Sequence, residues 1–377
     1  MDKKRILIVT SGFYPEQSPR AFRATELAKE FCRQGHEVVV MAPHKENVQP
    51  LLEEFPIQFV DLGQLMWHIP NVKGCGKLGA FCNKAINRLL PLLFAFPQME
   101  IFFMVKRKLK SEPKNYDLLI SIAVPHPIHW GIASVWSKKK EENIAPLWIS
   151  DCGDPYYIQE NDTFRPPFYF KWVEEWFMRK TDFITVPTET SYRGYLSEFH
   201  PKLKVIPQGF RFEDIDKKAV LNDGIVRLGY GGGFTLGRRD PRELLDFLTN
   251  LDQSVRFEFH LFTAQSQFIE PYIKDSRIKL HPPIPRTELL EILSTFNFVV
   301  NIANIGLAQT PSKLIDYAII EKPILQIISG NLDREVVLQF MNGNYEKQFI
   351  TMNPERYRIE EVVKQFLNLS ISGKDQQ

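Results

Sequence analysis

The sequence has few cysteines, little net charge and no long hydrophobic run, and each shortage excludes a class of protein. Its four cysteines, Cys32, Cys75, Cys82 and Cys152, form no CxxC pair and no zinc-ligand spacing with histidine. We therefore expect free thiols in a reducing compartment. A net charge of +2 over 377 residues argues against a dedicated nucleic-acid binder, which normally carries a strongly basic face.

Membrane-spanning and secretory segments are not expected either. No run of about 18 uninterrupted apolar residues is present, so we expect no transmembrane helix. The N-terminal "MDKKRILIVTSGFYPEQ" has only a short apolar run that ends at a glycine turn, which does not match a signal peptide. The apolar fraction of 44% and the charged fraction of 24% are typical of an ordinary soluble globular protein.

The order of hydrophobic segments predicts two α/β domains. "KRILIVTSG" reads as a buried strand, "SPRAFRATELAKEFCRQG" as an amphipathic helix with Ser18 as its N-cap, and "HEVVVMAP" as the next strand. Strand–helix–strand units imply a parallel sheet with helices on both faces. A second such series begins at "IVRLGYGGG". We predict two doubly wound Rossmann-like domains, 1–204 and 205–355, facing each other across a cleft, with a helix and tail over 356–377 packing back on the first domain.

Two motifs of the second domain have the form of an anion site. In "RLGYGGGFTLGRRDP" a strand runs into Gly232 and Gly233 and then into Arg238 and Arg239. Glycines let backbone N–H groups approach a phosphate, and arginine adds charge. The loop is neither a Walker A motif nor a dinucleotide fingerprint. The alternative is a tight turn with solvated arginines.

The second motif is "TPSKLIDYAIIEKPIL", a helix whose first turn carries Lys313. A cation at this end opposes the helix dipole unless an anion lies nearby. Ser312, Lys313 and Asp316 share one helical face, which suits a diphosphate and sugar hydroxyls. The alternative is an exposed Lys313–Asp316 ion pair at i,i+3. The first domain also has a glycine loop, "SGFYPEQSPRAFR", with Arg20 and Arg23, so the two loops together suggest a phosphorylated ligand.

The chain resembles retaining glycosyltransferases of family 4, which have the GT-B fold. The resemblance covers nearly the whole length and rests on "GFYPEQSPRAFRATELAKEFCRQGHEVVV", "YDLLISIAVPHPIHW", "WISDCGDPYY", "VIPQGF", "YGGGFTLGRRDP" and "PSKLIDYAIIEKPIL", in family order. It implies that Gly12 approaches the donor diphosphate or the acceptor. It also implies that Arg239 and Lys313, with Arg238, neutralise the leaving diphosphate, and that Asp316 holds the donor ribose.

The chain departs from the family pattern at two positions. Ala308 stands where a glutamate usually contacts the donor sugar, and Gly153 replaces a basic or histidine residue, leaving Asp154 as a catalytic candidate beside Asp151. His126 follows a strand and is a further polar candidate, although a lone histidine there is more often structural. With Arg20 and Arg23, Asp151 and His126 are the predicted acceptor-side contacts.

The resemblance implies a sugar transfer from a UDP- or GDP-linked donor to a lipid-linked saccharide or other saccharide acceptor, with retention of configuration. It also implies bacterial surface-polysaccharide synthesis, a cytoplasmic location with peripheral contact at the inner face of the cell membrane, and no cofactor or metal. Two alternatives remain open. One is a sugar-nucleotide epimerase of similar fold, and the other is a catalytically silent sugar-nucleotide binder or scaffold.

Residues 81–110 allow two interpretations. They contain a run of large apolar side chains with Lys and Arg at its borders, which suits contact with an anionic membrane surface. The alternative, which the sequence favours for most of these side chains, is a helix pair that packs into the core of the first domain. The side chains in question are Leu89, Leu90, Leu92, Leu93, Phe94, Phe96, Phe102 and Phe103.

Overall fold

The chain divides into two compact units in this computed structural model. One is Met1–Phe210 with Tyr357–Gln377, and the other is Arg211–Arg356. The described residues are 2–16, 18–43, 47–70, 76–158, 164–303, 312–350 and 353–375, with backbone alone described at 76–79, 312 and 372–375. The predicted boundary after residue 204 falls inside a strand of the first sheet, so the first unit continues past it.

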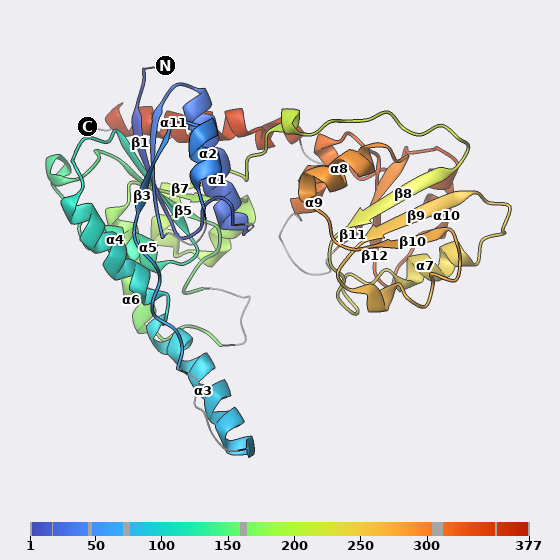
Figure 1. Cartoon of the computed structure of the whole chain (residues 1–377), viewed down its shortest axis with the longest axis horizontal. Helices are drawn as coiled ribbons and strands as arrows, with labels where there is room; N and C mark the ends of the chain where they lie inside the picture. Colours follow the sequence, from blue (N-terminus) through green and yellow to red (C-terminus); the bar gives the residue numbers. More distant parts are fainter. Residues whose placement is uncertain are drawn as a thin grey trace. The chain divides into compact units, whose positions relative to one another are not determined.

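The first unit is built on a seven-stranded parallel sheet of order β3-β2-β1-β4-β5-β6-β7 (Figure 1). Its strands are nearly continuous apolar runs because helices cover both faces of the sheet. The strands are β1 Arg5–Thr10, β2 Glu37–Ala42, β3 Ile57–Asp61, β4 Leu118–Ala123, β5 Trp148–Cys152, β6 Phe183–Val186 and β7 Leu203–Val205.

Two groups of helices cover the faces of this sheet. Side chains of α1 (Pro19–Arg33), α2 (Gln49–Glu54) and α11 (Ile359–Asp375) pack on one face. Those of α4 (Met99–Ser111), α5 (Pro127–Ala133) and α6 (Tyr169–Lys180) pack on the other. Ser18 caps α1 as predicted, because its hydroxyl accepts a hydrogen bond from the Ala21 N–H at 3.2 Å. The remaining helix, α3 (Gly76–Phe94), extends away from the sheet (Figure 1).

The second unit is a five-stranded parallel sheet of order β10-β9-β8-β11-β12. Its strands are β8 Val226–Gly231, β9 Phe257–Phe262, β10 Ile278–His281, β11 Phe298–Ala303 and β12 Ile324–Ile328. Its helices are α7 Arg242–Thr249, α8 Arg286–Ser294, α9 Ser312–Ile319 and α10 Arg334–Met341. Side chains of α7 and α10 enter the main apolar cluster on one face. On the other face α8 lies directly against β8, where Leu293 fills the space beside Gly229.

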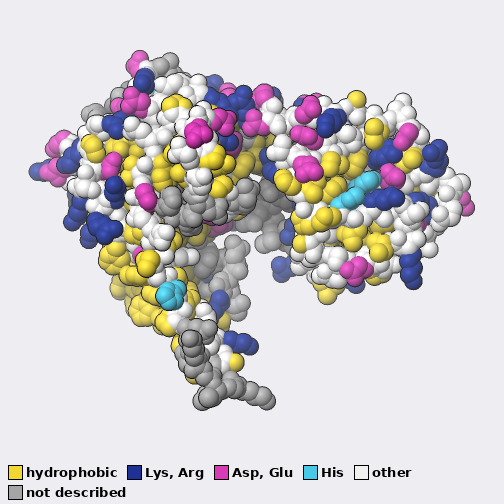
Figure 2. Space-filling view, in the orientation of Figure 1, with side chains coloured by type: hydrophobic (Ala, Val, Ile, Leu, Met, Phe, Trp, Pro, Cys, Tyr) yellow, Lys and Arg dark blue, Asp and Glu magenta, His cyan; other side chains and the backbone are white. Residues whose placement is uncertain are grey.

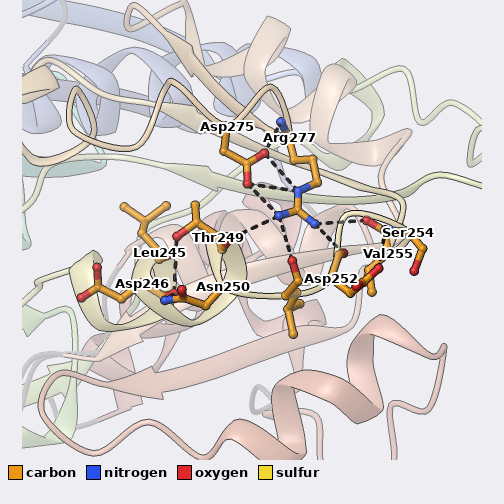
Figure 3. A network of polar contacts seen from close by, with 10 residues as sticks. Leu245, Asp246, Thr249, Asn250, Asp252, Ser254, Val255, Asp275 and Arg277 are labelled. Atoms are coloured by element: carbon orange, nitrogen blue, oxygen red, sulfur yellow. Dashed lines mark hydrogen bonds and ion pairs between the residues drawn. The ribbon is translucent and has the colours of Figure 1, made fainter.

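A buried ion pair joins the C-terminal end of α7 to the start of β10 (Figure 3). The Arg277 guanidinium lies 2.7 Å from an Asp275 carboxylate oxygen. It donates to the carbonyls of Thr249, the last residue of α7, and of Leu251, just beyond the helix. It also lies over the Phe257 ring, at 4.7 Å from the ring centre. Arg277 therefore satisfies carbonyl groups that a helix end leaves without intrahelical partners.

Replacing Arg277 by methionine is expected to destabilise the second unit by about 3 kcal/mol, because the partly buried Asp275 would lose its cation and the carbonyls of Thr249 and Leu251 would lose their donor. Urea unfolding followed by far-UV circular dichroism measures the loss. All six tryptophans lie before residue 177, in the first unit, so the tryptophan-fluorescence transition is expected not to move. Arg256→Met, at an exposed position of the same unit, is the matched control. Equal effects of the two substitutions would contradict the prediction.

Candidate functional site

Lys313 lies across the glycine loop that follows β8. Its ammonium donates a hydrogen bond to the Tyr230 hydroxyl at 2.8 Å and sits 4.0 Å from the centre of the Tyr230 ring. Gly232 has a φ of +135°, and a Cβ there would come within 3.1 Å of the Lys313 nitrogen. Both the backbone conformation and the space therefore require glycine. The alternative of an exposed Lys313–Asp316 pair is wrong, since each side chain is bound to a different partner.

The Lys313 ammonium is held at an electrostatic cost. Burial, and then the neighbouring Arg239 guanidinium, lower the pKa of Lys313 to about 7, while Asp316 acts in the opposite direction. The Arg239 Nε is itself buried and has no hydrogen-bond partner among the described residues. Two adjacent cations, one with an unsatisfied buried donor, form a site that an anion would stabilise.

Asp316 is held by an arginine that the sequence did not single out. The Arg286 Nε donates to Asp316 Oδ1 at 2.9 Å, and a second guanidinium nitrogen contacts the same oxygen. Burial raises the pKa of Asp316, whereas Arg286 and Lys313 lower it. Arg286 is the first residue of α8 and follows the strand segment "IKLHPPIP". The sequence signal that could have identified Arg286 is an arginine at the start of a helix that follows a parallel strand.

The other predicted residues of this loop take mixed positions. The Gly232 N–H donates to the Phe262 carbonyl at 3.0 Å, and the Gly233 carbonyl accepts from Tyr230, so these two groups bind within the protein. The Arg238 side chain is exposed. Ser312 begins α9, but its side chain lies outside the described residues, as does Ala308. The side chains that the structure brings together are thus Arg239, Lys313 and Asp316.

In the first unit, the Arg20 side chain occupies the space that a side chain at Gly153 would take. A Cβ at Gly153 would lie 1.4 Å from an Arg20 guanidinium nitrogen. The same guanidinium forms an ion pair with Asp154 at 3.3 Å, and the Asp154 side chain is 45% exposed. Only glycine therefore fits at position 153, because the Arg20 guanidinium of α1 occupies the space of a side chain there.

Arg23 and Asp151 do not have the predicted acceptor-side position. The Arg23 Nε lies 2.7 Å from Asp151, and both side chains are no more than 4% exposed. Further guanidinium N–H groups donate to the carbonyls of Ile206 and Pro207, and Thr185 donates to the Asp151 carboxylate. Every partner of this ion pair belongs to the protein, so we reassign Arg23 and Asp151 to a structural role.

His126 is also embedded in the first unit. Its Nε2 donates to the Asp154 backbone carbonyl at 3.0 Å, which fixes the tautomer because a carbonyl only accepts. Burial lowers the pKa of His126 to about 4, although the Asp154 carbonyl acts in the opposite direction. His126 is therefore neutral at physiological pH and orients the loop that carries Asp154.

The buried carboxyl Glu174 supports the same loop and was not predicted from the sequence. Its Oε1 accepts from the Tyr156 N–H at 3.2 Å, while its Oε2 is buried without a hydrogen-bond partner among the described residues. Burial raises the pKa of Glu174 to about 7. In "VEEWF" two adjacent glutamates gave no indication of which one faces inward.

The glycine loop of the first unit presents a carboxylate and not a cation. A Cβ at Gly12 would lie 3.0 Å from a Glu16 carboxylate oxygen and 3.2 Å from the Ala21 Cβ. Arg20 is paired with Asp154, and Arg23 is buried. The expected pair of cationic loops is thus reduced to one, in the second unit. No group of three His, Cys, Asp or Glu side chains with a metal-binding arrangement occurs among the described residues.

Solved structures of similar fold include several glycosyltransferases. One from Rickettsia africae ESF-5 matches with a TM-score of 0.63 at 10% identity, over 99% of this chain and 100% of that one. The apo form of WaaB, a lipopolysaccharide outer core galactosyltransferase, matches with a TM-score of 0.59 at 11% identity, over 98% and 99%. Anabaena HepE in complex with UDP matches with a TM-score of 0.53 at 11% identity, over 99% and 98%.

Comparisons with protein-family models and with curated protein sequences give no match. At 10–11% identity, the structural likeness speaks for the fold. Two parallel sheets flanked by helices, matched over nearly the full length of these enzymes, confirm the predicted fold class: the chain has the GT-B fold, with two Rossmann-like units.

Proposed function

We propose that this protein is a glycosyltransferase that moves a sugar from a nucleotide-sugar donor to a saccharide acceptor with retention of anomeric configuration. The observation that carries the proposal is the pair of cations at the glycine loop of the second unit. Lys313 has a lowered pKa, and Arg239 has a buried donor without a partner. Both features are explained if the diphosphate of a nucleotide sugar binds there, because it would pair with both cations.

The chemistry needs charge stabilisation more than a covalent catalyst. The bond between the anomeric carbon and the diphosphate oxygen breaks, the acceptor oxygen bonds to that carbon, and the hydroxyl proton leaves with the diphosphate. Lys313 and Arg239 would stabilise the negative charge on the leaving group, so we expect no metal. Asp316, oriented by Arg286, is placed one helical turn further and would accept hydrogen bonds from the ribose.

The acceptor side is proposed to lie on the first unit, with the exposed Asp154 and the partly buried Arg20 as its polar groups. We further propose a lipid-linked saccharide acceptor, a cytoplasmic location at the inner face of a bacterial membrane, and a role in surface-polysaccharide synthesis. WaaB, a lipopolysaccharide galactosyltransferase, and HepE, solved with UDP, are neighbours in fold that support this class of donor and acceptor.

A thermal-shift panel of UDP, GDP, ADP, CMP and their sugar conjugates tests the donor site. One nucleotide, UDP or GDP, is expected to stabilise the protein by about 2.7 kcal/mol at 100 times its Kd. Asp316→Asn is expected to weaken the effect of the nucleotide more than that of pyrophosphate, because the proposed ribose contact is lost while Lys313 and Arg239 remain. A panel without any nucleotide-linked shift would overturn the proposed donor site.

The two alternatives predict different products. A silent binder would show the thermal shift but no release of sugar or transfer to a membrane extract. An epimerase would change the stereochemistry of the donor sugar, which NMR of the recovered nucleotide sugar detects. Its acid–base chemistry needs carboxylates and histidines that reach the substrate, whereas His126 and Asp151 are engaged inside the first unit.

A further inference from the structure

Helix α3 is an arm of the first unit rather than part of its core. None of its described side chains, from Ala80 to Phe94, is buried. In Figure 1 it extends away from the sheet that α4 and α5 cover. The expectation that most large apolar side chains of 81–110 pack into the core is wrong for the named ones other than Phe102, which is partly buried and packs against the core of the first unit. The following are exposed or only partly buried: Leu89, Leu90, Leu92, Leu93, Phe94, Phe96, Phe102 and Phe103.

Aromatic side chains from neighbouring segments extend this apolar surface. Every exposed phenylalanine or tryptophan among the described residues belongs to it, and we call these residues the aromatic surface: Trp67, Phe81, Phe94, Phe103, Phe164, Phe168 and Trp172. Three contacts join its segments. The Trp67 and Phe103 rings are 5.8 Å apart, the Arg88 guanidinium lies 5.0 Å from the Phe164 ring centre, and the Tyr169 hydroxyl donates to the Leu93 carbonyl.

Exposed apolar area of this extent needs a partner. Four of its aromatic side chains, Phe81, Phe94, Phe168 and Trp172, are each 59–69% exposed. In Figure 2, hydrophobic side chains gather on the first unit where α4 leads into α3. Soluble proteins rarely expose contiguous apolar patches of this kind unless another molecule or a membrane covers them.

The charges around the aromatic surface favour an anionic partner. Residues 80–111 contain six lysines or arginines and one acidic residue, Glu100. Glu100 is buried, and its carboxylate accepts the N–H groups of Met66 and Trp67, so it contributes to the fold. The cations are Lys84, Arg88, Lys106, Arg107, Lys108 and Lys110.

The sequence of α3 has the amphipathic pattern of an interfacial helix. With 100° per residue, Phe81, Ala85 and Leu89 share one side, and Asn83 and Asn87 lie opposite them; Leu90 and Phe94, near the end of the helix, fall on the asparagine side. Lys84 and Arg88 fall between the two sides, where lysine and arginine reach lipid headgroups while their stems stay with the apolar face.

We propose that the aromatic surface inserts into the interface of an anionic lipid bilayer and anchors the protein there as a peripheral membrane protein. The proposal deepens the proposed function, which places a lipid-linked acceptor at a membrane, by assigning the residues that meet the lipid. Vesicle binding requires neither donor nor acceptor, so the two proposals can fail separately.

The structure of residues 80–111 favours a helix that lies in the membrane interface over one that crosses the bilayer. By length and composition Ala80–Ser111 would qualify as one membrane-spanning helix. In the structure it is two helices separated at Ala95–Gln98. The second of them, α4, packs Ile101, Val105 and Leu109 into the core of the first unit, so only its outer side, which carries the exposed Phe103, can meet lipid. The first carries asparagine, lysine and arginine along one side.

Co-sedimentation of the full chain with vesicles tests the proposal. Vesicles of phosphatidylglycerol and phosphatidylcholine are expected to bind the protein, and pure phosphatidylcholine vesicles to bind it at least tenfold more weakly. Lys84→Glu with Arg88→Glu is expected to reduce binding at least about 25-fold, since each cation near an anionic surface contributes about fivefold. Phe81→Ser with Leu89→Ser is expected to reduce it about tenfold, because less apolar area enters the lipid.

The changed side chains are not buried, so these variants are expected to keep the wild-type Tm. Ile350→Ser, at an 82% exposed position of the second unit, is the matched control and should bind like wild type. Equal binding of both vesicle types, or unchanged binding by both double variants, would overturn the proposal. So would resistance of vesicle-bound protein to alkaline carbonate extraction, which indicates a spanning helix. A dimer that forms without vesicles and is lost in Phe81→Ser would instead assign the surface to a second copy.

Discussion

Replacing Lys313 by methionine is expected to abolish most nucleotide-linked stabilisation and at the same time raise the Tm of the ligand-free protein at neutral pH. Methionine keeps the length and apolar contacts of the side chain but removes a cation that burial and Arg239 disfavour. Loss of the charge-assisted contact to a diphosphate should weaken UDP or GDP binding about 100-fold. Thermal shift and titration calorimetry measure both effects.

The pH dependence of nucleotide binding gives a second readout of the same residue. In the free protein the pKa of Lys313 is lowered to about 7, so the ammonium is partly deprotonated at neutral pH. A bound diphosphate favours the charged form, so binding takes up a proton. Affinity should therefore fall as pH rises above about 7, by up to tenfold per unit, and this slope should be absent in Lys313→Met.

The effect on folding stability has the opposite sign. The unfolded chain holds the Lys313 proton up to a pH near 10.5, whereas the folded chain releases it near 7. Between these values the unfolded state binds more protons, so the stability of the wild type rises with pH relative to that of the variant. The gain in Tm from Lys313→Met should accordingly be largest at or below pH 7 and shrink towards pH 10.

Lys322→Met is a suitable control, because Lys322 follows α9 and its pKa is also lowered by burial. It should leave nucleotide binding and its pH dependence unchanged. If Lys313→Met lowered the Tm and kept the full nucleotide shift, the bond to Tyr230 would be the whole role of Lys313, and the diphosphate site would be wrong.

Local sequence patterns predicted the elements that carry regular periodicity. The apolar runs gave the parallel strands, and the Ser18–Pro19 pair gave the start of α1, because each depends on neighbouring residues alone. The cationic second-unit loop was also visible, since its glycines and arginines lie within ten residues of one another. Each of these features depends on residues that are close together in the sequence.

Long-range pairing was not visible in the sequence. Arg20 and Arg23 lie three residues apart on the same helix, yet one reaches the half-exposed Asp154 and the other the buried Asp151. Arg286 meets Asp316 across 30 residues, and only the packed sheet brings them together. Periodicity did not predict the environment of α3 either. An apolar stripe indicates that a helix face is covered, but not whether the same protein or another partner covers it.

The Arg23 ion pair has a large expected effect on folding. Arg23 links four parts of the first unit: it belongs to α1, pairs with Asp151 of β5, donates to the carbonyls after β7, and lies 5.5 Å from the Phe366 ring of α11. Arg23→Met should destabilise the first unit by about 3–5 kcal/mol, because Asp151 would remain buried without a cation. Urea unfolding followed by tryptophan fluorescence reports on this unit alone.

Two further variants separate a structural role from an acceptor contact. Arg33→Met, on the same helix, removes a partly exposed cation 3.4 Å from the buried Glu30, which keeps a hydrogen bond from Gln34 at 2.9 Å, so it should cost less than Arg23→Met. Adding Asp151→Asn to Arg23→Met should recover part of the lost stability, since it removes the unpaired buried charge. An Arg23→Met protein that unfolds at the wild-type urea concentration but loses sugar transfer would return Arg23 to the acceptor site, because only a residue that contacts substrate can be needed for transfer without supporting the fold.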